Sequence, residues 1–276
     1  MFSKNIFKSF IKIMKILSHA FNAPKLRIKI NVHKITYFPI FNHQIRIMKF
    51  GVVIFPGSNC DHDMIYVLRD IMDQKVIELW HKDHDLKGAD AVVLPGGFSY
   101  GDYLRSGAIA RYSPIMDNVI EFAEKGGFVF GVCNGFQILC EARLLPGTLL
   151  HNSNQQFICK NVYIKPDNDS TIPTSGLDKN KAYKIPIAHA EGRYYADEEI
   201  LKTLRQNRQI LFRYCDENGI ITAEANPNGT TDNIAGICNE KQNVYGMMPH
   251  PERAADDELG NTDGRQIFES IIKNLR

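Results

Sequence analysis

One short segment constrains the fold more than any other, because an apolar strand there leads directly into a helix. Residues 131–135 (GVCNG) join an apolar run over 128–132 to a helical pattern over 134–143. A strand that turns into a helix so abruptly needs small flanking residues, which glycine supplies. Gly-x-nucleophile-x-Gly is typical of a nucleophile elbow at the carboxyl end of a strand. We therefore predict an α/β sheet with Cys133 at its carboxyl edge, where such sheets bind ligands.

From residue 49 onward, short apolar strands alternate with helical patterns. Short buried strands separated by helices predict a doubly wound, mostly parallel sheet of the flavodoxin-like kind, with helices on both faces. We expect residues 48–276 to form one such domain, with more strands after residue 157. The predicted strands cover 49–55, 75–80, 89–94 and 128–132, and the predicted helices cover 61–72 with Asp61 as N-cap, 107–125, 134–143 and 263–275.

The first 47 residues differ in composition from the rest of the chain. Nine of the 33 Lys and Arg residues lie there with no Asp or Glu, which leaves 24 basic against 31 acidic residues in 48–276. We expect residues 1–47 to be a basic leader that is disordered or not native, with Met48 as the native start. No apolar stretch is long enough for a membrane span or an ordinary signal peptide, because Lys12 and Lys15 interrupt the best one. The mildly acidic body argues against a nucleic-acid or anionic-membrane partner.

The cysteine pattern indicates reduced thiols and a cytoplasmic location. The six cysteines have no framework spacing and no Cys-x-x-Cys pair, and a chain of this length needs no disulfide or metal to build its core. We expect no metal site. His81 and His84 have helical ligand spacing, but the Asp and Gly residues around them are typical of a loop.

Cys133 is the candidate nucleophile, since a helix N-terminus favours its thiolate. A buried structural cysteine is the alternative, and the strand, the two glycines and the helix together argue against it. The best candidate base is His250, in the segment 248–252 (MPHPE), whose two prolines exclude helix and favour an extended chain. Side chains two residues apart on an extended chain point the same way, so Glu252 is expected to orient the imidazole. A solvated surface loop is the alternative there.

A glycine-rich segment, 94–98 (LPGGF), follows the predicted strand 89–94. Adjacent glycines let a backbone N–H face a ligand, so we predict the N–H groups of Gly97 and Asn134 as oxyanion donors. A plain tight turn is the alternative. The segment matches neither the P-loop nor the dinucleotide fingerprint, and no nucleotide is expected on this chain.

Together these segments resemble the class I, triad-type glutamine amidotransferases over nearly all of 48–276, and in finer detail the glutaminase subunits of purine biosynthesis. The resemblance implies that Cys133 attacks the glutamine carboxamide, with His250 as base and Glu252 as its acid partner. It also implies that ammonia leaves a glutamyl thioester, and that Gln137 contacts the bound glutamine. The matching segments are 55–61 (FPGSNCD), 95–105 (PGGFSYGDYLR), 107–110 (GAIA), 131–137 (GVCNGFQ), 187–189 (IAH), 191–194 (EGRY) and 247–253 (MMPHPER).

The resemblance further implies partners for the chain. Ammonia would pass to a large synthetase subunit that depends on ATP and Mg. A small third chain would bridge the two, and this chain would hold no cofactor itself. Two alternatives remain open: an α/β cysteine hydrolase of the peptidase or γ-glutamyl hydrolase type, and a non-catalytic binding protein with an ordinary thiol at Cys133. The polar residues His189, Glu191 and Arg193 fit either an ionic surface turn or a docking site for the synthetase.

Overall fold

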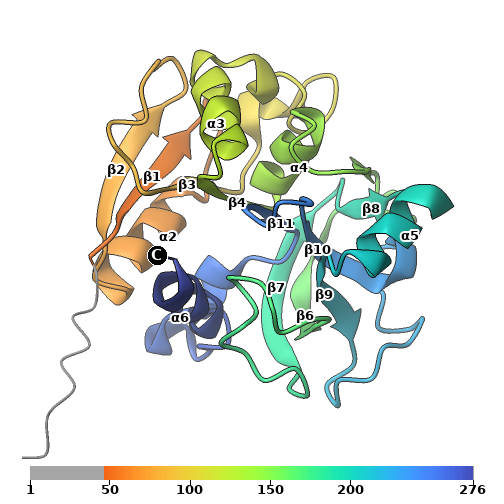
Figure 1. The fold of residues 1–276 in the computed structure, drawn as a ribbon. Coiled ribbons are helices and arrows are strands. Elements are labelled where there is room, and N and C mark those ends of the chain that lie inside the picture. The colour runs from red at the N-terminus through yellow and green to blue at the C-terminus, as the bar shows by residue number, and fades with distance from the viewer. Residues whose placement is uncertain (1–46, 276) are drawn as a thin grey trace, which may run out of the picture. The chain divides into compact units, whose positions relative to one another are not determined.

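A nine-stranded sheet organises the part of the chain that the computed structural model describes, residues 47–275 (Figure 1). The predicted leader, apart from its last residue, lies outside the described residues. The strand order is β2-β1-β3-β4-β11-β10-β9-β6-β7. The parallel half consists of β1 (Lys49–Ile54), β2 (Lys75–Trp80), β3 (Ala91–Leu94), β4 (Phe128–Val132) and β11 (Val244–Met247).

The sheet continues with antiparallel strands beyond β11. These are β10 (Ile234–Cys238), β9 (Ile210–Cys215), β6 (Ile158–Pro166) and β7 (Tyr183–His189), and a separate two-stranded sheet pairs β5 (Thr148–Leu150) with β8 (Arg193–Tyr195). Every residue of β3, β4 and β11 is buried, which explains their uninterrupted apolar sequences.

Helices cover both faces of the parallel half, so the predicted doubly wound fold is confirmed (Figure 1). Helices α2 and α6 lie on one face, and α3 and α4 lie on the other. No helix within residues 47–275 has the length and hydropathy needed to cross a bilayer. The helices are α2 (Asp61–Tyr66), α3 (Pro114–Glu124), α4 (Asn134–Glu141), α5 (Glu198–Gln206) and α6 (Arg265–Asn274), with a π-helical turn η1 (Val67–Ile71) and short 3₁₀ turns η2 (Ser99–Asp102), η3 (Ala110–Tyr112), η4 (Thr231–Asn233), η5 (Pro251–Ala254) and η6 (Asp257–Leu259).

Two details of the predicted helices were wrong. The continuous helix over 107–125 is broken at Ser113, whose φ of −65° and ψ of 138° are extended, because Pro114 disfavours a helical residue before it. The N-cap of α2 is Cys60, not Asp61. Asp61 is the first helical residue, and its buried Oδ1 has no hydrogen-bond partner among the described residues.

Candidate active site

The turn between β4 and α4 holds Cys133 in a strained conformation. Its φ is 50° and its ψ is −106°, a combination that non-glycine residues rarely adopt. The close packing explains the flanking glycines: a Cβ on Gly135 would lie 1.9 Å from Leu94 O, and one on Gly131 would lie 2.7 Å from the Gly135 backbone. The strand therefore turns into the helix only with glycine on both sides, as the elbow pattern predicted.

The parallel register brings the segment that carries His250 beside this turn. Val132 of β4 pairs with Met247 of β11, and the Cys133 N–H donates to Met247 O at 2.8 Å. Because parallel neighbours end at the same edge of a sheet, the chain that leaves β11 emerges next to Cys133. The His250 N–H then donates to Pro186 O of β7 at 2.8 Å, which fixes the backbone of the candidate base.

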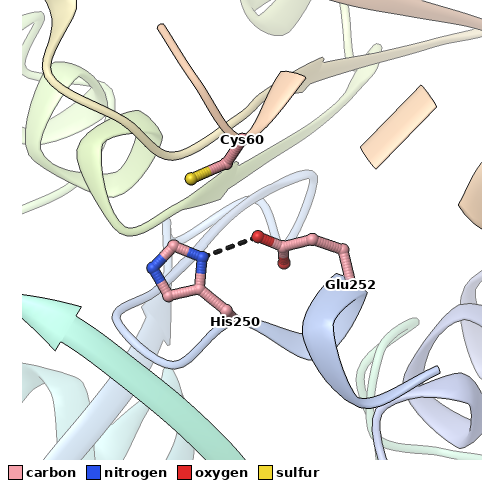
Figure 2. Close-up of side chains that lie close together, drawn as sticks. All are labelled: Cys60, His250 and Glu252. Atoms are coloured by element: carbon pink, nitrogen blue, oxygen red, sulfur yellow. Dashed lines mark hydrogen bonds and ion pairs between the residues drawn. The ribbon is translucent and has the colours of Figure 1, made fainter. Parts of the chain in front are cut away.

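His250 and Glu252 form a buried pair, although not on the extended chain that the sequence predicted. His250 has φ −99° and ψ 89°, and Glu252 lies in the 3₁₀ turn η5, because Pro251 starts that turn in place of an extended strand. The imidazole Nδ1 donates to Glu252 Oε1 at 2.6 Å (Figure 2). The two residues are 1% and 2% exposed, so solvent screens this contact very little.

The charge state of His250 follows from its neighbours. Burial alone lowers the pKa of the imidazole, but the Glu252 carboxylate and the Cys133 sulfur together raise that pKa well above its ordinary value. The imidazole Nε2 has no well-aligned hydrogen bond among the described residues. The Cys133 sulfur nevertheless lies close enough to the ring to raise its pKa. Catalytic hydrogen bonds are often this loose without substrate. The arrangement favours the charged imidazolium form of His250.

The glycine loop after β3 packs against the same group of side chains. A Cβ on Gly96 would lie 2.7 Å from His250 Cε1 and 3.3 Å from Cys133 Cβ. Gly97 has φ 130°, a conformation that favours glycine. The Phe98 N–H donates to Gly57 O at 3.2 Å in the bridge beside it, and no backbone bond occupies the Gly97 N–H among the described residues. Asn134 directly follows Cys133, and Gly97 follows Gly96, the glycine that packs against Cys133. The role of the two N–H groups as oxyanion donors stays a prediction.

Gln137, the predicted glutamine contact, lies one turn along α4. Its N–H donates to Cys133 O at 3.1 Å, and the residue is 4% exposed. Its side-chain nitrogen donates to Glu191 O at 2.6 Å, and its side-chain oxygen accepts from Asn134 Nδ2 at 2.9 Å. Its side chain therefore borders the elbow with both ends already bound, and its contact with glutamine stays a prediction.

Loop 99–106 is hydrogen-bonded to the start of α4. The Ser99 N–H donates to Asn134 Oδ1 at 3.2 Å, and Asn134 Nδ2 donates to Asp102 Oδ1 at 3.3 Å. Asp102 itself has a left-handed φ of 54°. Burial, with the nearby charge of Glu191, raises the pKa of Asp102 to about 6. Cys133, which directly precedes Asn134, is 4% exposed.

The polar cluster near β7 is less exposed than a surface turn would be. His189 is 3% exposed and its Nδ1 lies 3.1 Å from Asn152 Oδ1, while burial lowers its pKa to about 4 and keeps the ring neutral. Glu191 accepts from the Ser106 N–H at 3.0 Å. The Cys133 sulfur lies 3.8 Å from Ala188 O, so this end of β7 forms one wall of the site.

Cys60 also belongs to this site, although no pattern in the sequence placed it there. Its sulfur accepts a hydrogen bond from Arg253 Nη2 at 3.1 Å across 193 residues of chain. Figure 2 shows the same sulfur pointing toward the His250 ring. The one signal that could have found it is its position inside the segment 55–61 that carries the family resemblance.

Cys60, His250 and Glu252 are also the one group within residues 47–275 whose atoms could together hold a metal ion, since these atoms lie within 4.8 Å of one another. Thiolate, imidazole and carboxylate are the ligands that zinc prefers. The guanidinium of Arg253 already contacts the sulfur, however, and the hydrogen bond to Glu252 occupies the imidazole Nδ1. The positive charge and the internal hydrogen bond both disfavour a cation at this position.

Comparison with known proteins agrees with this geometry. A family model described as a CobB/CobQ-like glutamine amidotransferase domain matches residues 48–270. The chain belongs to this family of glutamine amidotransferases, so the predicted family and the prediction of an enzyme are confirmed.

Individual relatives within this family share more than half of their aligned residues with this chain. "Phosphoribosylformylglycinamidine synthase subunit PurQ" of Koribacter versatilis is 57% identical over 225 residues, which is 82% of this chain and 97% of the relative. The protein of the same name from Moorella thermoacetica is 56% identical over 225 residues, covering 82% of this chain and 95% of the relative.

Solved structures of other proteins share the fold of this chain. A chain in the structure of PurLQS from Thermotoga maritima is 39% identical, with a TM-score of 0.73 over 83% of this chain and all of that one. A GMP synthase-like protein from Thermoplasma acidophilum, 15% identical with a TM-score of 0.53 over 83% of this chain and 94% of that one, shares the fold.

Proposed function

We propose that this chain is the glutaminase subunit of phosphoribosylformylglycinamidine synthase, with Cys133, His250 and Glu252 as its catalytic triad. The observation that carries the proposal is the buried His250–Glu252 pair beside a cysteine on a strained elbow. The names of the relatives at 53–57% identity support the choice of enzyme.

Acylation begins with the Cys133 thiolate, which attacks the side-chain carboxamide carbon of glutamine. The carbonyl π electrons move to oxygen, and the N–H groups of Gly97 and Asn134 stabilise this oxyanion. His250 gives its Nε2 proton to the leaving nitrogen as the carbon–nitrogen bond breaks. Ammonia departs, and a γ-glutamyl thioester remains on Cys133.

Deacylation uses the same groups in reverse order. His250, now neutral, takes a proton from a water molecule that attacks the thioester carbon, and the carbon–sulfur bond breaks to release glutamate and the thiolate. Glu252 holds the imidazole in the tautomer with Nδ1 protonated and stabilises the imidazolium in both steps. Gln137 and Asn134 help to shape the pocket for glutamine.

The ammonia passes to partner subunits in this proposal. A large synthetase subunit would use ATP and Mg to convert formylglycinamide ribonucleotide into the amidine, and a small subunit would bridge the two chains. The name of the Thermotoga assembly, PurLQS, supports partners of this kind. This chain would hold no cofactor and would work in the cytoplasm. The cysteine-hydrolase alternative differs in needing no partner.

The test is amidine formation in the complex reassembled with the synthetase and small subunits, supplied either with glutamine or with ammonium. We expect Cys133→Ala to abolish the glutamine-dependent reaction and to leave the ammonium-dependent one intact. Cys238→Ala, which removes an equally buried sulfur from β10, is the matched control and should leave both reactions intact. Glutamine-dependent synthesis by Cys133→Ala would overturn the proposal, and turnover of γ-glutamyl peptides without partners would favour the hydrolase.

A further inference from the structure

A second sulfur lies within the proposed triad. Cys60 stands at the start of α2, 2% exposed, and its sulfur lies within 4.8 Å of the coordinating atoms of both His250 and Glu252. A Cβ on Gly96 would lie 3.2 Å from this sulfur and 2.7 Å from His250 Cε1. The end of β3, the sulfur and the imidazole edge are therefore packed against one another. The acylation and deacylation steps above make no use of Cys60.

Arg253 contacts this sulfur from one side, and the sulfur also donates to Oδ1 of the neighbouring Asn59 at 3.4 Å. The Arg253 Nη2 donates to Cys60 Sγ at 3.1 Å, and its Nε donates to Asp63 Oδ2 at 3.0 Å. Cys60 and Asp63 belong to the first turn of α2, whereas Arg253 directly follows Glu252 in η5. The guanidinium thus ties the helix that carries the sulfur to the turn that carries the carboxylate. Both hydrogen bonds have the charged guanidinium as donor, and a hydrogen bond from a charged donor is stronger than one from a neutral donor.

The imidazole is enclosed by groups from several elements. Glu252 faces it from η5, Cys133 from the β4–α4 turn, Cys60 from the start of α2, and His189 from β7 is near enough to interact with its charge. Among the described residues, only Glu252 makes a well-aligned hydrogen bond to the ring, through Nδ1. A single hydrogen bond does not fully restrain the side-chain torsions of His250. The direction in which Nε2 points therefore also depends on the groups that pack against the ring.

We propose that Cys60 is a positioning residue for His250: its sulfur, held by Arg253, packs against the imidazole and keeps the ring between Glu252 and Cys133. The inference rests on the proposed function for its catalytic consequence. Cys60 acts through His250 and does not touch the substrate in this account. Arg253 acts one step further away, through Cys60.

The test compares Cys60→Ala, Cys60→Ser, Arg253→Met and the double variant Cys60→Ala/Arg253→Met. The rate at which iodoacetamide alkylates Cys133 is measured against pH by mass spectrometry of the Cys133 peptide, so that reaction at Cys60 itself does not interfere. Glutamine turnover in the complex gives kcat and KM. Cys238→Ala, with its buried sulfur in β10, is the matched control.

We expect Cys60→Ala to lower kcat by on the order of 10- to 100-fold, as misplacement of a catalytic group does, with KM for glutamine unchanged. The acid limb of the alkylation profile should move to higher pH, because a misplaced imidazolium no longer stabilises the thiolate. Cys60→Ser should recover part of both effects, since its hydroxyl can still accept from Arg253. Arg253→Met should repeat the effects of Cys60→Ala, and the double variant should be no worse than either single one.

Two results would overturn the inference. One is a Cys60→Ala protein whose kcat and alkylation profile match those of Cys238→Ala, and the other is an additive loss in the double variant. Should Cys60→Ala fail to fold by circular dichroism, Cys60→Ser and Arg253→Met provide the same comparison. Absence of glutamine turnover by the unsubstituted complex would instead contradict the proposed function, whereas the alkylation profile tests Cys60 independently of turnover.

Discussion

Glu252 Oε1 lies 2.6 Å from Nδ1 of His250, and both side chains are almost wholly buried. Burial without a partner would push the imidazole toward its neutral form, so the carboxylate is what makes an imidazolium stable here. The same contact leaves Nε2 as the one nitrogen free to exchange a proton with Cys133. This contact thus sets the tautomer of the proposed base, and the charge of Glu252, together with the Cys133 sulfur, favours its protonated form.

Removing the charge of Glu252 should therefore impair the enzyme severely without changing its shape. Glu252→Gln is expected to lower kcat by on the order of 10²- to 10⁴-fold, because burial then dominates and lowers the pKa of His250. The acid limb of Cys133 alkylation should move to higher pH for the same reason. Steady-state kinetics and the alkylation profile measure these effects. Glu269→Gln, an exposed position on α6, is the control and should resemble the unsubstituted protein.

The elbow should tolerate no side chain at Gly135. A methyl group there would lie 1.9 Å from Leu94 O, so two backbone segments would have to separate. We expect Gly135→Ala to lower the free energy of unfolding by more than about 3 kcal/mol, or to prevent folding. Gly126→Ala is the matched control: its φ is 88° but nothing lies within 4 Å, so it should cost about 1 kcal/mol. Urea unfolding curves of equal midpoint for the two variants would contradict this account of the elbow.

Asp102 should reduce stability at neutral pH. Burial and Glu191 raise its folded-state pKa to about 6, above the unfolded value of about 4. Ionisation therefore opposes folding, an effect absent below the unfolded pKa that grows as pH rises and is complete above the folded pKa. Asp102→Asn keeps an acceptor for Asn134. It should stabilise the protein by about 1 kcal/mol at neutral pH, after allowance for partial exposure, and have no effect below the unfolded pKa of about 4. Unfolding curves at the two pH values give the comparison, and an equal effect at both would contradict it.

Local sequence patterns were sufficient for β1, β2, β3 and β4 and for the elbow, but they did not single out β11, the fifth parallel strand. Strand β4 is buried on both faces, so its sequence is apolar throughout, and the glycines at 131 and 135 mark the backbone contacts that a Cβ would prevent. The pairing of His250 with Glu252 was also predicted, but for the wrong geometry. Pro251 excludes an ordinary helix yet suits the first position of a 3₁₀ turn, and that turn brings the carboxylate back to the ring.

The contacts that were missed join parts of the chain that no local pattern connects. Cys60 and Arg253 are 193 residues apart, and their hydrogen bond exists only because the start of α2 and η5 meet at the same edge of the sheet. Gly96 looked like a turn residue beside the more suggestive Gly97, whereas the space it leaves is filled by His250 and Cys60. The break at Ser113 was missed because apolar spacing continues across it, although Pro114 marks it in the sequence.

The central claim is that Cys133, and not Cys60 beside it, carries the acyl group. The most direct measurement is acid-quenched labelling of the complex with glutamine that carries isotope in its carbon chain, followed by mass spectrometry of both cysteine peptides. We predict a hydroxylamine-sensitive glutamyl label on the Cys133 peptide, lost in Cys133→Ala and retained in Cys60→Ser. A glutamyl label on the Cys60 peptide, or turnover of glutamine with no label on Cys133 under any quench time, would contradict the account.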